Sequence, residues 1–277
     1  MSWIILRSGS MKKKKFTLDE LNAYKTAYGK ALERKELLVS LLKPFAVAFL
    51  FTYLLFYYWW VAAIAGVIAA FYGYRVVMPI SIRRVYEAKS FRQRNNFINN
   101  MTQILINPDR TMLSALETVA ERSEGEFQEH LYRLLTNLQG TNNEEIKKAF
   151  DQLILEYKED VIFELFIEQL TTAMIEGRTN TDTLKDIKTL HNELKVRQDG
   201  FLAKKREQEI NYKIICTIVL GLILAITFSF GWSVYVDTFA HQFVGWIFST
   251  TYLIIMSLFY RSFIKKLGDD SVLEVQI

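Results

Sequence analysis

Three long stretches of this chain carry no charged side chain, and they flank a charged region with helical periodicity. The uncharged stretches are residues 44–74, 214–236 and 242–260, which are 31, 23 and 19 residues long. A transmembrane helix needs about 20 consecutive, mostly apolar residues, so each stretch predicts membrane insertion. In the charged region, residues 83–213, apolar residues recur at intervals of three and four, which is typical of amphipathic helices.

The first uncharged stretch is too long for one span. As a single helix it would measure about 46 Å at ~1.5 Å per residue, against a hydrocarbon core of ~30 Å. Two helices fit if the first recruits residues 37–42 and the second runs to Pro79. Amphipathic aromatic rings favour the membrane–water interface. The turn is therefore predicted at four consecutive aromatic residues, Tyr57, Tyr58, Trp59 and Trp60.

The other two uncharged stretches predict a second hairpin with the same sidedness. Residues 237–241 connect them without lysine or arginine, and three further interfacial aromatic residues flank this turn: Trp232, Tyr235 and Trp246. The opposite ends of the spans are basic. The flanking residues are Lys30, Arg34, Lys35, Lys43, Arg83, Arg84, Lys89, Arg92, Arg94, Arg261, Lys265 and Lys266. This asymmetry predicts a multi-pass membrane protein with both termini and residues 83–213 in the cytoplasm. A chain rich in Lys, Asn and Ile, with four spans and short external turns, fits the bacterial inner (cytoplasmic) membrane.

The expected fold class is all-α, with four transmembrane helices, arranged as two helical hairpins, flanking a six-helix cytoplasmic bundle. The expected segments are a basic amphipathic leader (1–36), a hairpin (37–80), the six-helix domain (83–213), a second hairpin (214–262) and a cytoplasmic tail (263–277). Helix ends are predicted from caps and breakers. They are an end at Asn107–Pro108, a start at Asp109 or Thr111, a break at residues 123–125, an end at Gly140, a cap at Asn142 or Asn143, an end at Gly177 and a cap at Thr181 or Asp182. Nothing requires the last of these helices to stop before the third span.

Charge is segregated along the chain. Residues 1–43 hold ten Lys/Arg against four Asp/Glu, whereas residues 117–182 hold fifteen Asp/Glu against six Lys/Arg. An acidic domain disfavours nucleic-acid binding. Acidic residues gather at two predicted turns, and the candidate partner-binding residues are Glu117, Glu121, Glu124, Glu126, Glu129, Glu156, Glu159 and Asp160. Two interpretations stay open: the charge keeps the domain away from anionic lipid, or it docks a basic cytoplasmic partner.

The chain carries no recognisable catalytic or cofactor motif. His130, His191 and His241 are too far apart in sequence for a helical metal site, and the single cysteine, Cys216, lies inside a predicted span. Glycine-rich phosphate-binding motifs are absent from the sequence. We expect no catalytic residue, no metal and no cofactor, and so no enzyme.

The layout and three phrases of the charged region resemble the type II secretion system F superfamily, and within it the TadB-like inner-membrane platform proteins of tight-adherence (Flp) pilus assembly. The phrases are a turn followed by an Ala-Leu pair in residues 108–116, a Gly turn followed by Ala149-Phe150, and a Gly turn leading to Leu184. Phe150 stands where the family has leucine, Arg178 where it has a second glycine, and Asn107-Pro108 where it has a glycine turn.

The resemblance implies a non-enzymatic scaffold with several partners. A cytoplasmic assembly ATPase would supply the energy, a paralogous platform protein or a second copy would pair with the chain, and pilin-like subunits would be lifted out of the lipid bilayer. Two alternatives remain. A permease subunit would need polar residues inside its spans, and a membrane-bound sensor or regulator would need an external domain.

Overall fold

The computed structural model describes residues 17–107, 109–139, 142–177 and 180–267. Thirteen helical segments follow one another along these residues, which contain no strand. The segments are α1 (Leu18–Thr26), α2 (Arg34–Phe56), α3 (Trp59–Tyr72), the π-helix η1 (Gly73–Val77), α4 (Met78–Leu105), α5 (Met112–Arg122), α6 (Gly125–Asn137), α7 (Asn143–Glu156), α8 (Val161–Glu176), α9 (Thr181–Phe230), α10 (Trp232–Tyr235), the π-helix η2 (Val236–Ala240) and α11 (Phe243–Leu267). The all-helical prediction is confirmed.

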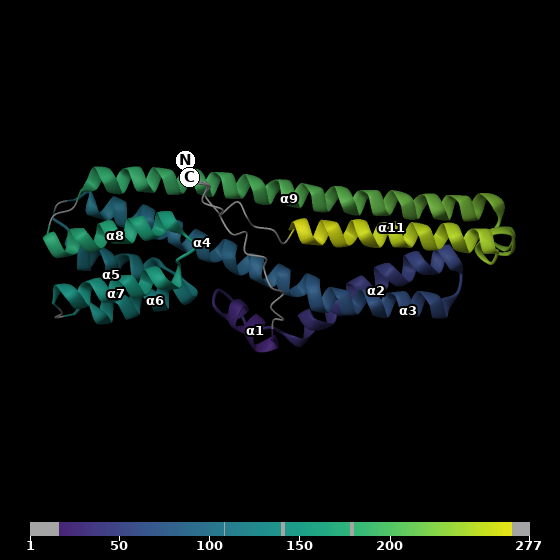
Figure 1. Ribbon diagram of the computed structural model, residues 1–277, viewed down its shortest axis with the longest axis horizontal. Coiled ribbons are helices and arrows are strands. Elements are labelled where there is room, and N and C mark those ends of the chain that lie inside the picture. The colour runs from purple at the N-terminus through teal and green to yellow at the C-terminus, as the bar shows by residue number, and fades with distance from the viewer. Residues whose placement is uncertain (1–16, 108, 140–141, 178–179, 268–277) are drawn as a thin grey trace, which may run out of the picture.

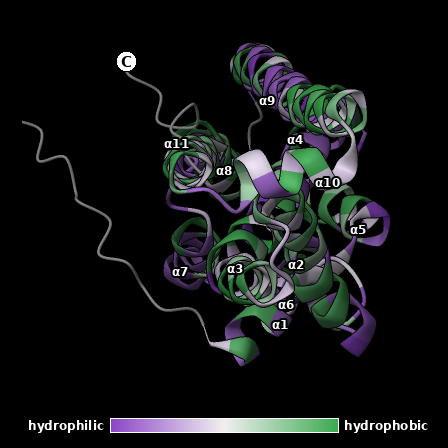
Figure 2. Ribbon diagram, turned by 90° about the vertical axis from the view of Figure 1, so that its right-hand side faces the viewer, coloured by the Kyte–Doolittle hydropathy of each residue, from purple (hydrophilic) through white to green (hydrophobic). Residues whose placement is uncertain are grey.

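Four helices are long and apolar enough to cross a membrane, which identifies a multi-pass membrane protein. They run over Arg34–Phe56, Trp59–Leu105, Thr181–Phe230 and Phe243–Lys266. Figure 1 shows an elongated molecule with the short helices α5 to α8 gathered at one end and the turns of the apolar helices at the other. Seen from the latter end, α2 and α3 are coloured predominantly hydrophobic (Figure 2).

The turn between the first two apolar helices lies within the predicted aromatic run. Helix α2 ends at Phe56, and Tyr57 takes the left-handed conformation with φ 54°. A non-glycine residue in this conformation is uncommon. The Tyr57 amide donates a 2.7 Å hydrogen bond to the Tyr53 carbonyl, which closes the helix before α3 begins at Trp59.

Helix α2 packs closely against the helix formed by α3 and η1, because Gly73 at the start of η1 lies against Pro44. Pro44 lies inside α2, where it removes one backbone hydrogen bond. A Cβ atom at Gly73 would lie 2.5 Å from the Pro44 ring and 3.1 Å from the Ser40 carbonyl. Only a glycine allows this approach. The backbone adopts its π-helical turn, η1, from this glycine onward, before α4 continues the same helix.

Two helices therefore pass from the apolar part of the molecule into the charged part without a break. One is α3–η1–α4, and the other is α9, whose 50 residues measure about 75 Å at ~1.5 Å per residue. No helix end lies between residues 80 and 83, where the sequence analysis put the end of the first hairpin. Figure 1 shows α9 along the full length of the molecule and α4 crossing from the α2–α3 pair to the short helices.

The helical domain is the region in which α5 to α8 pack on the C-terminal half of α4 and the first turns of α9. Phe97, Phe127, Phe163 and Phe166 are completely buried at its centre. The Phe97 ring meets those of Phe127 and Phe163 edge to face, at centroid distances of 5.5 and 5.9 Å. Such aromatic pairs contribute about 0.5–1.5 kcal/mol each beyond burial, so this cluster fixes how the helices pack.

Most predicted helix ends agree with the structure. Thr111 caps α5 and Asn142 caps α7, each accepting a backbone N–H three residues on, and α8 ends at Gly177 in the left-handed conformation. The predicted cap of the last helix was wrong. The side chain of Asn180, rather than Thr181 or Asp182, accepts from the Thr183 amide. Gly140, Pro108, Arg178, residues 1–16 of the predicted leader and residues 268–277 of the predicted tail lie outside the described residues.

Candidate functional site

A buried ion pair connects α4 to the start of α8. The Arg94 Nε donates to Asp160 Oδ2 at 2.7 Å, and these residues are 8% and 9% exposed. The other oxygen, Oδ1, accepts from the Phe163 amide at 3.1 Å and caps α8. Arg94 Nη1 also donates to the Ser90 hydroxyl one turn earlier on α4, at 2.7 Å. Both charges are thus held by several hydrogen bonds, which a buried pair needs.

Histidine 191 extends this pair to α9. Its Nε2 lies 3.3 Å from Asp160 Oδ2 and its Nδ1 lies 3.0 Å from the Asn95 amide nitrogen. The side-chain amide nitrogen of Asn95 can only donate, so His191 Nδ1 is the acceptor. His191 Nε2 therefore carries the ring proton and donates it to Asp160 Oδ2. The Phe91 ring stacks on the imidazole at 4.7 Å and helps to seal it from solvent, so that His191 is 0% exposed.

An amide ladder continues the connection between α4 and α9. Asn192 Oδ1 accepts from Asn95 Nδ2 at 2.8 Å and from Asn99 Nδ2 at 2.9 Å, and Asn192 Nδ2 donates to Asn99 Oδ1 at 2.9 Å. We call the residues Arg94, Asn95, Asn99, Asp160, His191 and Asn192 the polar junction. It joins the two helices that continue into the apolar spans.

The electrostatics of the polar junction favour an ionised Asp160. Burial alone would raise the pKa of this carboxyl group, but the hydrogen bond from His191 and the positive charge of Arg94 outweigh burial and lower its pKa to about 2. The Arg94 guanidinium also lies over the Tyr157 ring at 5.0 Å. Opposite charge and hydrogen bonding are the usual causes of such a depression.

The polar junction is suited to holding helices together. Asp160 and His191 each have partners on both sides, which leaves no open position for a substrate next to them. Among the residues that the structure describes, no group of three His, Cys, Asp or Glu side chains could hold a metal ion. A fully satisfied polar network in a core specifies which elements meet, and this one brings together α4, α8 and α9.

The predicted acidic residues divide into an exposed set and an interior one. Glu117, Glu121, Glu124, Glu129, Glu156 and Glu159 are exposed. Glu126 is partly buried and accepts a 2.7 Å hydrogen bond from the Tyr86 hydroxyl. Asp160 does not belong to this surface, because it is buried and neutralised by Arg94. Arg94, expected at the membrane flank, lies in the same interior.

The exposed acidic residues lie at the end of the helical domain that is nearer the spans. The amide of Glu126, at the start of α6, bonds the Ala27 carbonyl in the segment that precedes α2. Its carboxylate contacts Tyr86, about 12 Å along α4 from Met78 at ~1.5 Å per residue. We call the six exposed glutamates the acidic shoulder.

The predicted interface residues meet at the opposite end of the molecule. The Tyr57 ring lies edge to face against Trp232 at 4.6 Å and against Tyr235 at 5.8 Å. Tyr58 stacks on His241 at 4.3 Å and meets Trp246 at 5.9 Å. The structure therefore brings the two predicted turns into one aromatic cluster, and it leaves Trp59 and Trp60 exposed beside it.

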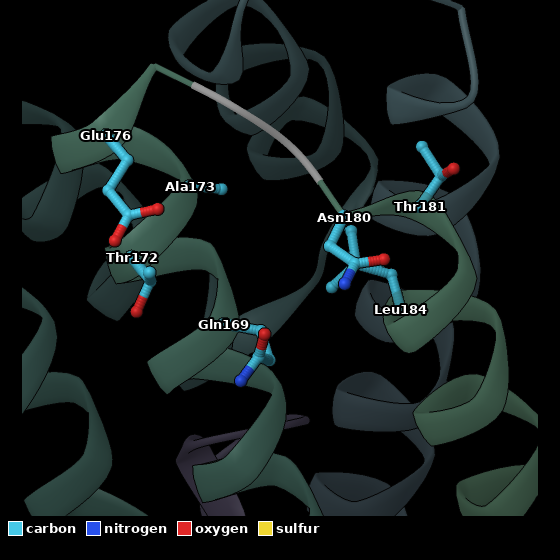
Figure 3. Close-up of a pocket in the computed structure, with 7 residues that line it drawn as sticks. All are labelled: Gln169, Thr172, Ala173, Glu176, Asn180, Thr181 and Leu184. Atoms are coloured by element: carbon cyan, nitrogen blue, oxygen red, sulfur yellow. The ribbon is translucent and has the colours of Figure 1, made fainter.

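A polar groove of about 440 Å³ opens between the last turns of α8 and the first turn of α9. Figure 3 shows Gln169, Thr172 and Glu176 on the α8 side and Asn180, Thr181 and Leu184 on the α9 side. These side chains offer hydrogen bonds and one carboxylate, without a nucleophile beside a base. The groove lies at the end of the domain far from the spans.

Comparison with known proteins gives one strong match. The chain is 44% identical over 266 residues to an uncharacterized protein of Bacillus anthracis, and the match covers 96% of both chains. No family model matches the chain. No solved structure matches it either.

Proposed function

We propose that this chain, which belongs to the same family as the uncharacterized Bacillus anthracis protein, is a non-enzymatic platform of a pilus-like or secretion-like assembly machine in the cytoplasmic membrane. In this proposal the helical domain is cytoplasmic and receives movement from an assembly ATPase. The spans pass that movement to pilin-like subunits in the bilayer.

The observation that carries the proposal is the continuity of two helices through the polar junction. Both α3–η1–α4 and α9 run unbroken from a span into the helical domain, where Asn95, Asn99 and Asn192 join them. Helices transmit displacement along their axes because each peptide is hydrogen-bonded to the next turn. A force on the domain would consequently reach the second span, at the start of α3–η1–α4, and the third span, at the end of α9, together.

The acidic shoulder is the proposed docking surface for a basic patch on the ATPase. Glu117 and Glu121 lie one turn apart on α5, and Glu124 lies at the N-cap of α6 two residues after α5 ends, so three exposed negative charges lie close together along the chain. Repulsion between these like charges lowers the stability of the free domain, and binding of an oppositely charged partner would relieve that repulsion. None of the six glutamates of the acidic shoulder belongs to the polar junction, which contains Asp160.

The permease alternative receives less support from the spans. Arg75 directly follows the first uncharged stretch and is the one charged residue between Pro44 and Pro79. It lies in η1, and the carbon of its guanidinium is 5.8 Å from the centroid of the Phe71 ring. Transport pathways usually contain several intramembrane polar groups facing one another. For a sensor, the short connections at residues 57–58 and 231–242 would have to serve as the external domain.

The test is binding of the full-length chain, in membranes, to the assembly ATPase encoded nearest to its gene. We expect charge reversal by Glu117→Lys, Glu121→Lys and Glu124→Lys together to weaken binding by about tenfold or more at low salt. The control reverses Glu144, Glu145 and Glu168, which are also exposed but lie on α7 and α8. Equal binding by the two triple variants would reject docking through the acidic shoulder, and absence of any binding by the unaltered chain would reject the platform function.

A further inference from the structure

The helix that leaves the second span is most easily bent at η1. Gly73 begins this π-helical turn, and Pro79 follows it at the second residue of α4. Sharp kinks in helices occur mainly at prolines and at π-helical turns, so α3–η1–α4 is expected to bend here first. Such a bend would swing the helical domain relative to the first hairpin, which α2 and α3 form.

Residues 17–28, which contain α1 and which we call the N-terminal brace, are fastened to the start of the first span. Asn22 Oδ1 accepts a hydrogen bond from the Leu32 amide at 2.9 Å. The Lys25 ammonium forms an ion pair with Glu36 in the first turn of α2. The short connection between the brace and α2 is therefore held at both ends by side chains of the brace.

The brace packs on α4 beyond η1. Its one buried side chain within α1 is Leu21, at 4% exposed. The rings of Tyr24 and Tyr28 lie on the Tyr86 ring, at centroid distances of 4.9 and 5.6 Å. Lys89 Nζ donates to the Tyr28 carbonyl at 2.9 Å. Tyr86 and Lys89 lie about 12 and 17 Å along α4 from its start at ~1.5 Å per residue, so the brace holds the helix well past the π-helical turn.

The brace also caps α6. The Ala27 carbonyl accepts from the Glu126 amide at 2.8 Å. The first amides of a helix need acceptors from outside it, and within the described residues the Glu124 side chain at the N-cap makes no capping hydrogen bond. Close approach depends on Gly125, whose φ is +63° and where a Cβ atom would overlap the Ala27 carbonyl oxygen. The α6 sequence is thus adapted to the brace.

Tyr28 brings the brace to the polar junction. Its side chain packs against the core of the helical domain, and its buried hydroxyl has Ser90 and Tyr157 as hydrogen-bonding neighbours. The Ser90 hydroxyl in turn accepts from Arg94 Nη1 at 2.7 Å. Polar groups linked in this way in a core specify which elements meet. The brace is therefore a built-in part of the domain.

We infer that the N-terminal brace fixes the angle between the first hairpin and the helical domain, because it bridges from the start of α2 across η1 to α4, α6 and the polar junction. The brace, α2 and the α3–η1–α4 helix form a closed triangle, whose angles stay fixed as long as its sides do. A force on the domain would then displace the first hairpin as one body. That last step rests on the proposed platform function, whereas the brace is a property of the chain alone and is tested without a partner.

The test measures the distance between the first hairpin and the domain by pulsed electron spin resonance, in the full-length chain in lipid nanodiscs. Spin labels at Ile68→Cys on α3 and Gln152→Cys on α7, in a Cys216→Ser background, report the angle at η1, because both positions are exposed. We expect a narrow distribution of distances in the chain that is otherwise unaltered.

The first variant detaches the brace from α2 and leaves its contacts with the domain in place. It combines a short glycine-serine insertion between Gly29 and Lys30 with Asn22→Ala and Lys25→Ala. We expect the distance distribution to widen by about twofold or more, because a flexible linker does not transmit force. The same insertion placed before Thr17 is the control and should leave the width unchanged.

The second variant detaches the brace from the domain. Gly125→Ala displaces the Ala27 carbonyl and should widen the distribution by about twofold or more. Gly177→Ala is the matched control, because its φ is +67° and a Cβ atom there would meet no atom of the described residues within 4 Å. Its distribution should stay narrow.

A second label pair shows whether the domain itself stays intact. Glu117→Cys and Gln152→Cys, both exposed and both within the domain, should keep their width in every variant. If Gly125→Ala widens this pair as well, the domain has loosened, and the insertion variant decides. The brace is overturned if detaching it from α2 leaves the hairpin-to-domain width unchanged, if Gly125→Ala gives the same narrow distribution as Gly177→Ala, or if the distribution is already broad without any of these changes.

Discussion

Arg94 on α4 and Asp160 at the start of α8 form a buried ion pair, with Nε and Oδ2 2.7 Å apart. Phe91, Tyr157 and Phe163 surround the guanidinium, whose carbon lies 5.6, 5.0 and 6.0 Å from their ring centroids. Neither charge could be left alone in such a place, because an unpaired buried charge is far costlier than a paired one. The ion pair therefore determines where α8 meets α4, the helix that continues from the second span.

The first prediction concerns the charge of this pair. Asp160→Asn keeps an oxygen that can cap α8 but leaves Arg94 buried without a counter-ion. We expect it to lower the free energy of unfolding by roughly 3–5 kcal/mol. Its neighbour Glu159 is exposed, and Glu159→Gln should change stability by less than about 0.5 kcal/mol. Thermal and denaturant unfolding of the purified chain in detergent would measure both, and equal stability of the two variants would contradict a structural ion pair.

The second prediction is a pH dependence. The pKa of Asp160 falls from 3.8 to about 2 in the folded protein. The stabilisation is consequently complete above pH ~4 and is lost as the pH falls towards 2, which amounts to about 2 kcal/mol. The unfolding free energy of the unaltered chain should drop more steeply over this range than that of Asp160→Asn. Parallel pH profiles of the two proteins would show that the carboxylate is not stabilised by folding.

The third prediction concerns the packing of the first hairpin. A Cβ atom at Gly73 would meet the rigid Pro44 ring at 2.5 Å, whereas one at Gly66 would meet the Phe45 ring, which can rotate, at 2.8 Å. We expect Gly73→Ala to destabilise the protein by about 1–3 kcal/mol, and Gly66→Ala by less. Gly221→Ala in α9 is the control, since a Cβ atom there has open space. Unfolding in mixed micelles provides the measurement, and an unaffected Gly73→Ala would mean that α2 and α3 pack differently.

Local sequence signals predicted the helices well. Thr111 and Asn142 were recognisable as caps because a side-chain oxygen before an apolar periodic run satisfies a helix's first amides, and both do so here. The aromatic run at residues 57–60 marked the turn between the first two apolar helices. The last cap was misassigned by one or two residues, because Asn180, Thr181 and Asp182 are all good caps and sequence does not rank them.

The polar junction could not be predicted from the sequence. Its hydrogen bonds connect residues that are far apart along the chain: 66 positions separate Arg94 from Asp160, and 96 separate Asn95 from His191. Arg94 sits among other basic residues after a span, and Asp160 follows Glu159 at a helix start, so each had a simpler local explanation. The pair of asparagines at positions 95 and 99, one helical turn apart on a face with Phe91 and Ile98, was the one visible signal of a polar core.

Continuity between the spans and the helical domain was anticipated for α9 and missed for α4. Pro79 indicated a helix end, since proline removes a backbone hydrogen bond in the interior of a helix. In the structure it lies at the second residue of α4, directly after the π-helical turn of η1, where the helix already departs from regular bonding. The proline is tolerated there, and the helix continues.

Sidedness is the claim on which the platform account depends most, and cysteine accessibility in intact cells measures it directly. In a Cys216→Ser background, Asp237→Cys lies in η2 beside the aromatic cluster and Glu124→Cys lies on the acidic shoulder. We expect a membrane-impermeant maleimide to label Asp237→Cys in intact cells and Glu124→Cys only after the cells are broken. Labelling of Glu124→Cys in intact cells would place the helical domain outside and would contradict its coupling to a cytoplasmic ATPase.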